Sequence, residues 1–248
     1  DFYRIQAQGT DIKTYHINQY MFRENFEPYA KAGDEVLYMC FSTGIAGTFN
    51  AANLAKEELL EEYPEFDLTI IDTKCASLGF GLAVEKILRM QANGAPKDLI
   101  IEAAQFFCEH MEHIVTVETL EYLYKGGRLS KTSAVLGGVL DLKPIIEVND
   151  DGALVAIEKV RGRHKSLKRC VELVGERGVE LDKQVIGVVH GNDPETCEKV
   201  SAMLMEKYHC RGIIKSWVGC AIGAHTGPGI IGIVFLSASE EKYAEYLK

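Results

Sequence analysis

A loop of small residues, STGIAGT at 42–48, follows an apolar run of the chain and precedes a helical pattern. Gly44 and Gly47 let the backbone turn tightly and approach a ligand closely. Ser42 and Thr43 add hydroxyl groups, and the amino end of the following helix adds partial positive charge. Such a loop is suited to hold a carboxylate or a phosphate. A plain strand-to-helix turn with capping hydroxyls remains the alternative.

Asp72 ends the next predicted strand, 25 residues after Gly47. An acidic residue near this place binds the ribose in dinucleotide-binding folds. A nucleotide-binding α/β enzyme therefore stays open as an alternative, as does a helix-capping role for Asp72, although the loop lacks the middle glycine of that motif. A literal G-x-G-x-x-G at Gly227, Gly229 and Gly232 leads into the apolar run IIGIVFL rather than into a helix, so we do not assign it to a dinucleotide.

His225 lies among small residues in CAIGAHTGPG. A histidine at such a turn can face a cleft and donate a hydrogen bond to an oxyanion near neutral pH, and a structural histidine is the alternative. His110 and His113 lie three residues apart near a predicted helix end, where a structural role is expected. We predict no metal site, since the histidines and cysteines lack ligand spacing.

Two segments concentrate positive charge. KGGR at 125–128 is interpreted as a solvated turn. The basic run KVRGRHKSLKR at 159–169 fits a solvated helix face, or a surface that receives a phosphate or an acidic partner. We find no Ser-His-Asp order and no supported pair of catalytic carboxylates, so the chain shows no recognisable catalytic set.

The composition describes the protein that must position these groups. The chain has 248 residues, and 27 basic against 36 acidic side chains give a net charge of −9, which argues against nucleic-acid binding. Seven cysteines without a C-x-x-C pair indicate reduced thiols and a cytoplasmic protein. The stretch 216–239 lacks acidic and basic residues but contains five glycines and a proline, so we predict a buried glycine-rich loop and strand and no membrane insertion.

The first part of the chain alternates short apolar strands with helical patterns. Such alternation predicts a parallel sheet covered on both faces. The predicted strands lie at 36–41 and 68–71, and the predicted helices at 18–32, 49–62, 76–92 and 97–111.

The second part adds a hairpin signal at Asp151-Gly152, which predicts a mixed sheet. The predicted strands are 114–117, 143–148, 154–160, 184–190, 212–216 and 230–236, and the predicted helices are 118–124, 129–140, 165–176 and one starting at Asp193-Pro194. We therefore expect two α/β domains, residues 1–111 and 112–248, with the cleft between them as the ligand site.

Seven segments, in order over most of the chain, resemble motifs of the DegV family of fatty-acid-binding proteins, which includes the lipid-carrying subunits of bacterial fatty acid kinase. They are IKTYHIN at 12–18, FSTGIAGTFNAA at 41–52, IIDTKCASLGFG at 70–81, ETLEYLYKGGRLS at 118–130, LKPII at 142–146, the DG hairpin with EKVRG at 151–162, and HTGPG-x-x-G at 225–232.

The resemblance implies two α/β domains with a long acyl chain, such as palmitate, buried between them and no other cofactor. It implies that Thr14 and Ser42, with Thr43 beside it, hold the carboxylate, and that His225 and Arg161 lie near the head group. It further implies a non-catalytic, monomeric carrier that presents the acid to an ATP-dependent kinase subunit. Burial of about fifteen methylenes at ~0.8 kcal/mol each offers ~12 kcal/mol before the costs of association, so the tail can supply most of the affinity.

The chain departs from the family pattern at three places. Tyr15 and His16 replace small and amide residues after Thr14, and Ala46 stands where many members have a serine. The change at Ala46 removes a possible carboxylate donor. The family normally begins with a strand that ends in Asp-Ser, so we expect the first domain to lack its first strand region.

Overall fold

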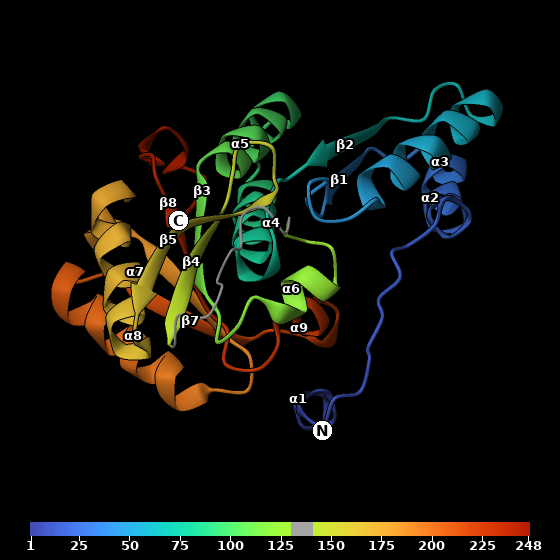
Figure 1. The fold of residues 1–248 in the computed structure, drawn as a ribbon. Helices are drawn as coiled ribbons and strands as arrows, with labels where there is room; N and C mark the ends of the chain where they lie inside the picture. The colour runs from blue at the N-terminus through green and yellow to red at the C-terminus, as the bar shows by residue number, and fades with distance from the viewer. Residues whose placement is uncertain (130–140) are drawn as a thin grey trace.

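The structure is a computed structural model that describes residues 1–129 and 141–248 (Figure 1). The helix predicted over 129–140 falls, apart from Leu129, outside these residues.

A two-stranded parallel sheet organises the first part of the chain. Successive strand side chains point to opposite faces. Tyr38 and Ile70 pack on the α2–α3 side, whereas Met39 and Ile71 pack on the α4–α5 side. The predicted parallel sheet with helices on both faces is therefore confirmed. Its elements are α2 (Gln19–Ala32), β1 (Val36–Cys40), α3 (Thr48–Glu62), β2 (Leu68–Asp72), α4 (Ser77–Ala92) and α5 (Lys97–Glu109).

A six-stranded mixed sheet in the order β5-β4-β3-β8-β6-β7 organises the second part of the chain. β6 and β7 are parallel and the other neighbours are antiparallel, so the predicted mixed sheet and the hairpin at Asp151-Gly152 are confirmed. The strands are β3 (Met111–Thr116), β4 (Leu142–Val148), β5 (Leu154–Arg161), β6 (Val185–His190), β7 (Gly212–Trp217) and β8 (Ile231–Leu236). The helices are α6 (Glu121–Lys125), α7 (Arg163–Arg177), α8 (Pro194–Tyr208) and α9 (Cys220–Thr226), with short 3-10 turns at Leu181–Lys183 and Glu241–Tyr243.

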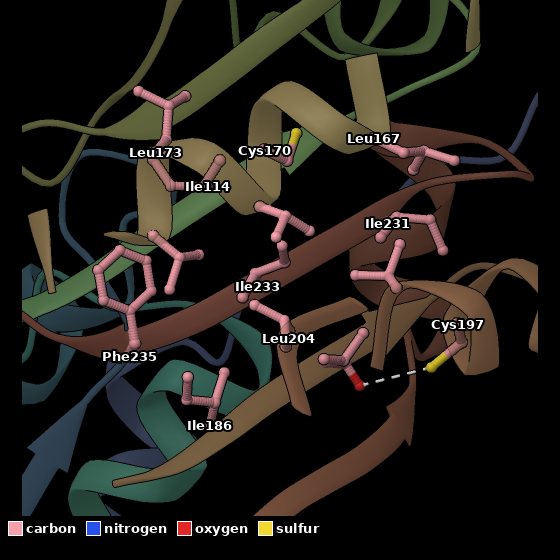
Figure 2. Close-up of a cluster of buried hydrophobic side chains, with 14 of the residues drawn as sticks. Ile114, Leu167, Cys170, Leu173, Ile186, Cys197, Leu204, Ile231, Ile233 and Phe235 are labelled. Atoms are coloured by element: carbon pink, nitrogen blue, oxygen red, sulfur yellow. Dashed lines mark hydrogen bonds between the residues drawn. The ribbon is translucent and has the colours of Figure 1, made fainter. Parts of the chain in front are cut away.

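Helices α7 and α8 cover one face of this sheet. Their apolar side chains meet Ile114, Ile231 and Ile233 in a closely packed core (Figure 2). Each such fully buried aliphatic side chain contributes roughly 1.5–3 kcal/mol to folding. The opposite face meets α4, which packs on β3, β6 and β8. Other side chains of the sheet, among them Val115, Ile146 and Val189, line a cavity.

The domain boundary predicted near residue 112 stays a prediction. Helices α4 and α5 precede it in the chain, yet α4 contacts the six-stranded sheet. Val234, Leu236 and Tyr243 from the chain end share one apolar cluster with Met39 and Ile71.

The glycine-rich stretch contains a short helix, α9, where the sequence predicts only a loop and a strand. Gly223 of α9 receives the ring of Tyr3 from the amino-terminal helix α1 (Phe2–Ala7): a Cβ at Gly223 would lie 2.7 Å from the Tyr3 hydroxyl. Packing between two distant segments thus outweighs the low helix propensity of glycine. None of the helices in the described ranges is long and apolar enough to cross a membrane. All seven cysteines are free, and only Cys220 is exposed.

Candidate functional site

A cavity of about 530 Å³ lies between the two sheets and the helices α4, α6 and α9. This volume falls within the range of roughly 300–1,000 Å³ that is typical of small-molecule sites. Most of the lining side chains are apolar. They come from both parts of the chain, and include Phe41, Ile45, Phe80, Val115, Val117, Leu123, Ile146, Val189, Val218, Ile222, Ile230 and Val234.

An extended segment, residues 10–17, runs from α1 to α2 (Figure 1); we call it the strap. Thr14 to Ile17 line the cavity. Within the described residues, the strap backbone makes no hydrogen bond to another segment. Its side-chain link to the body is Thr14, whose Oγ1 lies 2.6 Å from Nε2 of His225. His16 rests against Gly47, where a Cβ would lie 3.3 Å from the His16 ring.

His225, in the last turn of α9, lines the cavity together with Thr14 and Arg128. Burial lowers the pKa of His225, and the positive charge of Arg128 lowers it further. Arg128 is itself oriented by its Nη1, which donates to the Gly126 carbonyl at 2.6 Å. A neutral imidazole, a hydroxyl and a guanidinium therefore lie on the α9 side of the cavity, where the hydroxyl and the guanidinium can donate to an anionic oxygen.

The amino-terminal helix holds α9 in place. Tyr3 donates its hydroxyl to the carbonyl of Val218 at 2.7 Å. Gln6 donates its amide to the carbonyls of Gly223 and Ala224, at 2.9 and 3.2 Å. The carbonyl of Ala224 thus gains a partner that a helix end otherwise lacks, and the carbonyl of Gly223, which also accepts from the backbone N–H of Gly227, gains a second one.

Ser42 and Thr43 have other partners. Ser42 is fully buried, and its hydroxyl donates to the carbonyl of Gly152 at 2.6 Å, at the tip of the β4–β5 hairpin. Gly44 packs on the same tip, since a Cβ there would lie 2.4 Å from the carbonyl carbon of Gly152. Neither Ser42 nor Thr43 is among the residues that line the cavity. The loop therefore anchors the hairpin, and a carboxylate contact of these two residues stays a prediction.

Asp72 joins the two loops that follow β1 and β2. Its Oδ1 accepts from the backbone N–H groups of Thr43 and Lys74, each at 3.1 Å. One carboxylate oxygen is thus occupied by the protein itself. Asp72 therefore joins two turns, and the helix-capping alternative for it is wrong, because the N-cap of α4 is Ala76 and has no side-chain cap.

Arg161 is exposed at the end of β5, paired in register with Leu142, and does not line the cavity. It begins a cationic surface, which we define as Lys159, Arg161, His164, Lys165 and Lys168. Among the ion pairs of residues 1–129 and 141–248, none involves a member of this surface. Of the five predicted site residues, the structure brings Thr14 and His225 together and places Ser42, Thr43 and Arg161 elsewhere.

On the α4 side of the cavity lies His113, which is almost completely buried. Its Nδ1 lies 3.1 Å from the carbonyl of Met111, and its Nε2 lies 3.3 Å from the backbone nitrogen of Ala76. Burial lowers its pKa to about 4, so the ring is neutral near pH 7. The structural role expected for His113 agrees with these contacts. No group of three potential metal ligands occurs in the described ranges.

Sequence reasoning missed Arg128 and His16 as lining residues. The KGGR segment carried the signal for Arg128, because a cation beside two glycines can lie on a close backbone turn. Its interpretation as a solvated turn overlooked that α6 packs on α9.

The chain is similar to known proteins over most of its length. A family model described as "Uncharacterised protein, DegV family COG1307" matches residues 1–238. A DegV domain-containing protein from Clostridium perfringens is 38% identical over 240 residues, which cover 97% of this chain and 82% of that protein.

Two solved structures are similar over most of their length. A protein from Thermotoga maritima, whose structure is described as revealing a fatty acid binding function, is 26% identical, with a TM-score of 0.79 over 94% of this chain and 80% of that one. The fatty acid kinase B3 protein of Streptococcus pneumoniae, loaded with linoleic acid, is 20% identical, with a TM-score of 0.85 over 96% and 84% of the two chains, and shows the shared fold.

Proposed function

The chain belongs to the DegV family, and we propose that it carries one long-chain fatty acid in the cavity and presents the carboxylate to an ATP-dependent kinase subunit for phosphorylation. We place this carrier in the cytoplasm, as a monomer without catalytic residues of its own. The fatty acid binding function described for the Thermotoga maritima protein supports the ligand class.

The observation that carries the proposal is the distribution of polarity in the cavity. Apolar side chains from both sheets surround most of it, while Thr14, His225 and Arg128 meet on one side. An acyl chain matches the apolar lining, and each buried methylene contributes ~0.8 kcal/mol before the costs of association. A single anionic head group matches the polar side. A nucleotide or phosphorylated metabolite would leave most of this lining in contact with polar atoms.

We assign the carboxylate to the hydroxyl of Thr14, which His225 positions, with Arg128 supplying positive charge nearby. The Thr14 hydroxyl is already oriented by His225 at 2.6 Å, so little ordering remains to be done on binding. Ser42 and Thr43 enter this assignment only if the hairpin tip at Gly152 releases the Ser42 hydroxyl.

Mass spectrometry of lipid extracted from the purified protein tests the ligand. We expect a stoichiometric fatty acid with a long chain. Recovery of a nucleotide or a phosphorylated metabolite would instead support the alternative of an α/β enzyme acting at the loop 42–48.

The kinase partner requires its own test. The cationic surface around Arg161 has no ion pairs within the described residues, although the protein carries a net charge of −9. We propose that it receives an acidic or phosphate-bearing surface of the kinase, because opposite charges steer association.

Arg161→Glu should then lower the rate of acyl phosphate formation, roughly tenfold for the loss of a steered contact, while fatty acid affinity stays unchanged. Arg211→Glu is the matched control, since Arg211 is exposed beside β7 at the opposite edge of the sheet. Equal losses in the two variants, or an equal loss of binding and phosphorylation in Arg161→Glu, would contradict the assignment of this surface.

A further inference from the structure

The two ring nitrogens of His225 differ in their hydrogen bonding. Nδ1 is buried and has no hydrogen-bond partner among residues 1–129 and 141–248, whereas Nε2 lies 2.6 Å from Oγ1 of Thr14. Buried polar atoms are nearly always paired, so an exception calls for a physical cause.

Gly126 supplies that cause. A Cβ built on Gly126 would lie 2.1 Å from Nδ1 of His225 and 3.0 Å from its Cγ, so the imidazole lies directly against the glycine backbone. The backbone N–H of Gly126 is not available to Nδ1, because it donates to the Tyr122 carbonyl at 2.9 Å. The Gly126 carbonyl accepts from Arg128 and is not in hydrogen-bonding geometry with Nδ1.

The two neutral tautomers of His225 differ in what they leave unpaired. A proton on Nδ1 would place an N–H donor in the buried position that lacks an acceptor. A proton on Nε2 instead donates to Thr14 and leaves only a lone pair at Nδ1. Orphaned buried donors are rarer in proteins than under-satisfied acceptors, so the second arrangement is the one that the packing favours.

We infer that Gly126 is a positioning residue: by seating the ring of His225 against the backbone, it fixes the Nε2–H tautomer and so makes Thr14 Oγ1 an acceptor from the ring. The Thr14 hydroxyl hydrogen is then left to donate to the ligand. This last step rests on the proposed function, because it needs a carboxylate in the cavity. The tautomer itself does not.

The direction of this relay has a consequence for binding. With the opposite tautomer, Thr14 would donate to Nε2 and would present only lone pairs to a carboxylate, which is an acceptor too. Gly126 thus determines whether Thr14 attracts or repels an anionic head group, without touching that head group itself.

Nitrogen-15 NMR of the histidine side chains tests the tautomer in the ligand-free protein near neutral pH. His225→Gln identifies the His225 resonances by their disappearance. We expect a pyrrole-like Nε2 and a pyridine-like Nδ1. A pyrrole-like Nδ1 would overturn the inference even if fatty acid binding is confirmed.

Gly126→Ala tests the positioning role. The added methyl group must displace the ring, so we expect the His225 resonances to shift and fatty acid affinity to fall ~10–100-fold, as for loss of one hydrogen bond to a charged group. Gly219→Ala, at the N-cap of α9, is the matched control, since a Cβ there meets nothing within 4 Å in the described parts of the chain and its φ of −68° suits alanine. An unchanged tautomer and affinity in Gly126→Ala would contradict the proposal.

If Gly126→Ala does not fold, Thr14→Val decides. It removes the acceptor of the Nε2 proton but keeps Gly126, so we expect Nε2 of His225 to stay pyrrole-like. A mixture of tautomers, or a pyrrole-like Nδ1, would show that Thr14 and not Gly126 fixes the tautomer, and would overturn the inference. If the protein proved to bind no fatty acid, the proposed function would be wrong but the tautomer could still be tested, because both NMR spectra are recorded on lipid-free protein.

Discussion

Two histidines face the same cavity from opposite sides, and both are seated against a glycine. A Cβ at Gly79 would lie 2.2 Å from Nε2 of His113, and one at Gly126 would lie 2.1 Å from Nδ1 of His225. Burial lowers the pKa of both imidazoles, so both are disposed to be neutral. By residue type, packing and charge, the two regions are therefore alike.

Their hydrogen bonds differ. Both ring nitrogens of His113 contact backbone groups, those of Met111 and Ala76. His225 contacts a side chain, Thr14, which belongs to a strap with no backbone hydrogen bond to another segment in the described parts. Both ring nitrogens of His113 are thus paired with backbone groups, whereas the partner of His225 is a hydroxyl that can also donate to a ligand oxygen. A buried histidine indicates a binding site when its partner keeps a free donor, and a structural role when its partners are backbone groups.

The largest effect that separates the two regions is the acid dependence of stability on the α4 side. The unfolded chain takes up a proton at His113 near pH 6.5, while the folded protein does so only near pH 4. The unfolded state binds more protons in this window, so the unfolding free energy falls as the pH drops from 6.5 to 4, by up to about 3 kcal/mol. Denaturant unfolding at several pH values measures this slope.

His113→Gln isolates the contribution of His113. His190 and His225, whose pKa values burial also lowers, remain in both proteins and cancel in the difference. We expect the variant to lose most of the slope between pH 6.5 and 4. A variant with the slope of wild type would show that His113 does not distinguish the two regions.

The next effect concerns affinity on the α9 side. Thr14→Val removes the hydroxyl that we assign to the carboxylate, and should weaken fatty acid binding by about 1.5–3 kcal/mol, as for a hydrogen bond to a charged group. Thr226→Val is the matched control, because Thr226 also lines the cavity but donates its hydroxyl to the Ile222 carbonyl at 3.2 Å. Titration with a fluorescent fatty acid measures both.

The outcome for Ser42 sharpens the same contrast. Its hydroxyl anchors the hairpin tip, so Ser42→Ala should destabilise the fold more than it weakens fatty acid binding. We expect the loss of unfolding free energy to exceed the loss of binding free energy by about 1 kcal/mol. Comparable losses of affinity in Thr14→Val and Ser42→Ala, with additive losses in the double variant, would return Ser42 to the carboxylate site.

The regular elements of the fold were predictable because their signals are local. Apolar runs between turn residues locate β1 and β2, and Asp193 caps α8 through its bond to Thr196, as the Asp-Pro pair indicates. The hairpin follows from Asp151-Gly152 in the same way. These patterns need no knowledge of distant residues.

The candidate site was predictable only in part, because its contacts are long-range. Thr14 and His225 are 211 residues apart in sequence, and the family resemblance placed both near the head group without giving their contact. The partner of Ser42 lies 110 residues away, so its hydroxyl looked available in the sequence. Helix α9 escaped prediction since its stability comes from Tyr3 and Gln6 of α1.

The smallest expected effects are those of two separate variants, Ala46→Ser and Ala76→Ser, each of which adds one hydroxyl to the cavity wall. Ala46 lines the cavity beside Gly47, which the strap residue His16 contacts. Ala46→Ser should give the carboxylate a further donor and tighten fatty acid binding by about 1 kcal/mol, roughly fivefold. Ala76 also lines the cavity, on the α4 side, and is the N-cap of α4, with extended backbone at φ −137° and ψ 157° and no side-chain cap.

Ala76→Ser should therefore stabilise the fold by about 1 kcal/mol through capping and leave affinity unchanged. The same chemical change is thus expected to raise affinity alone at residue 46 and stability alone at residue 76, because only the α9 side has an anionic ligand group to receive it. Calorimetric melting with and without fatty acid separates the two quantities. If Ala76→Ser tightened binding as much as Ala46→Ser, the head group would not be confined to the α9 side, and the division of the cavity into a binding side and a structural side would be wrong.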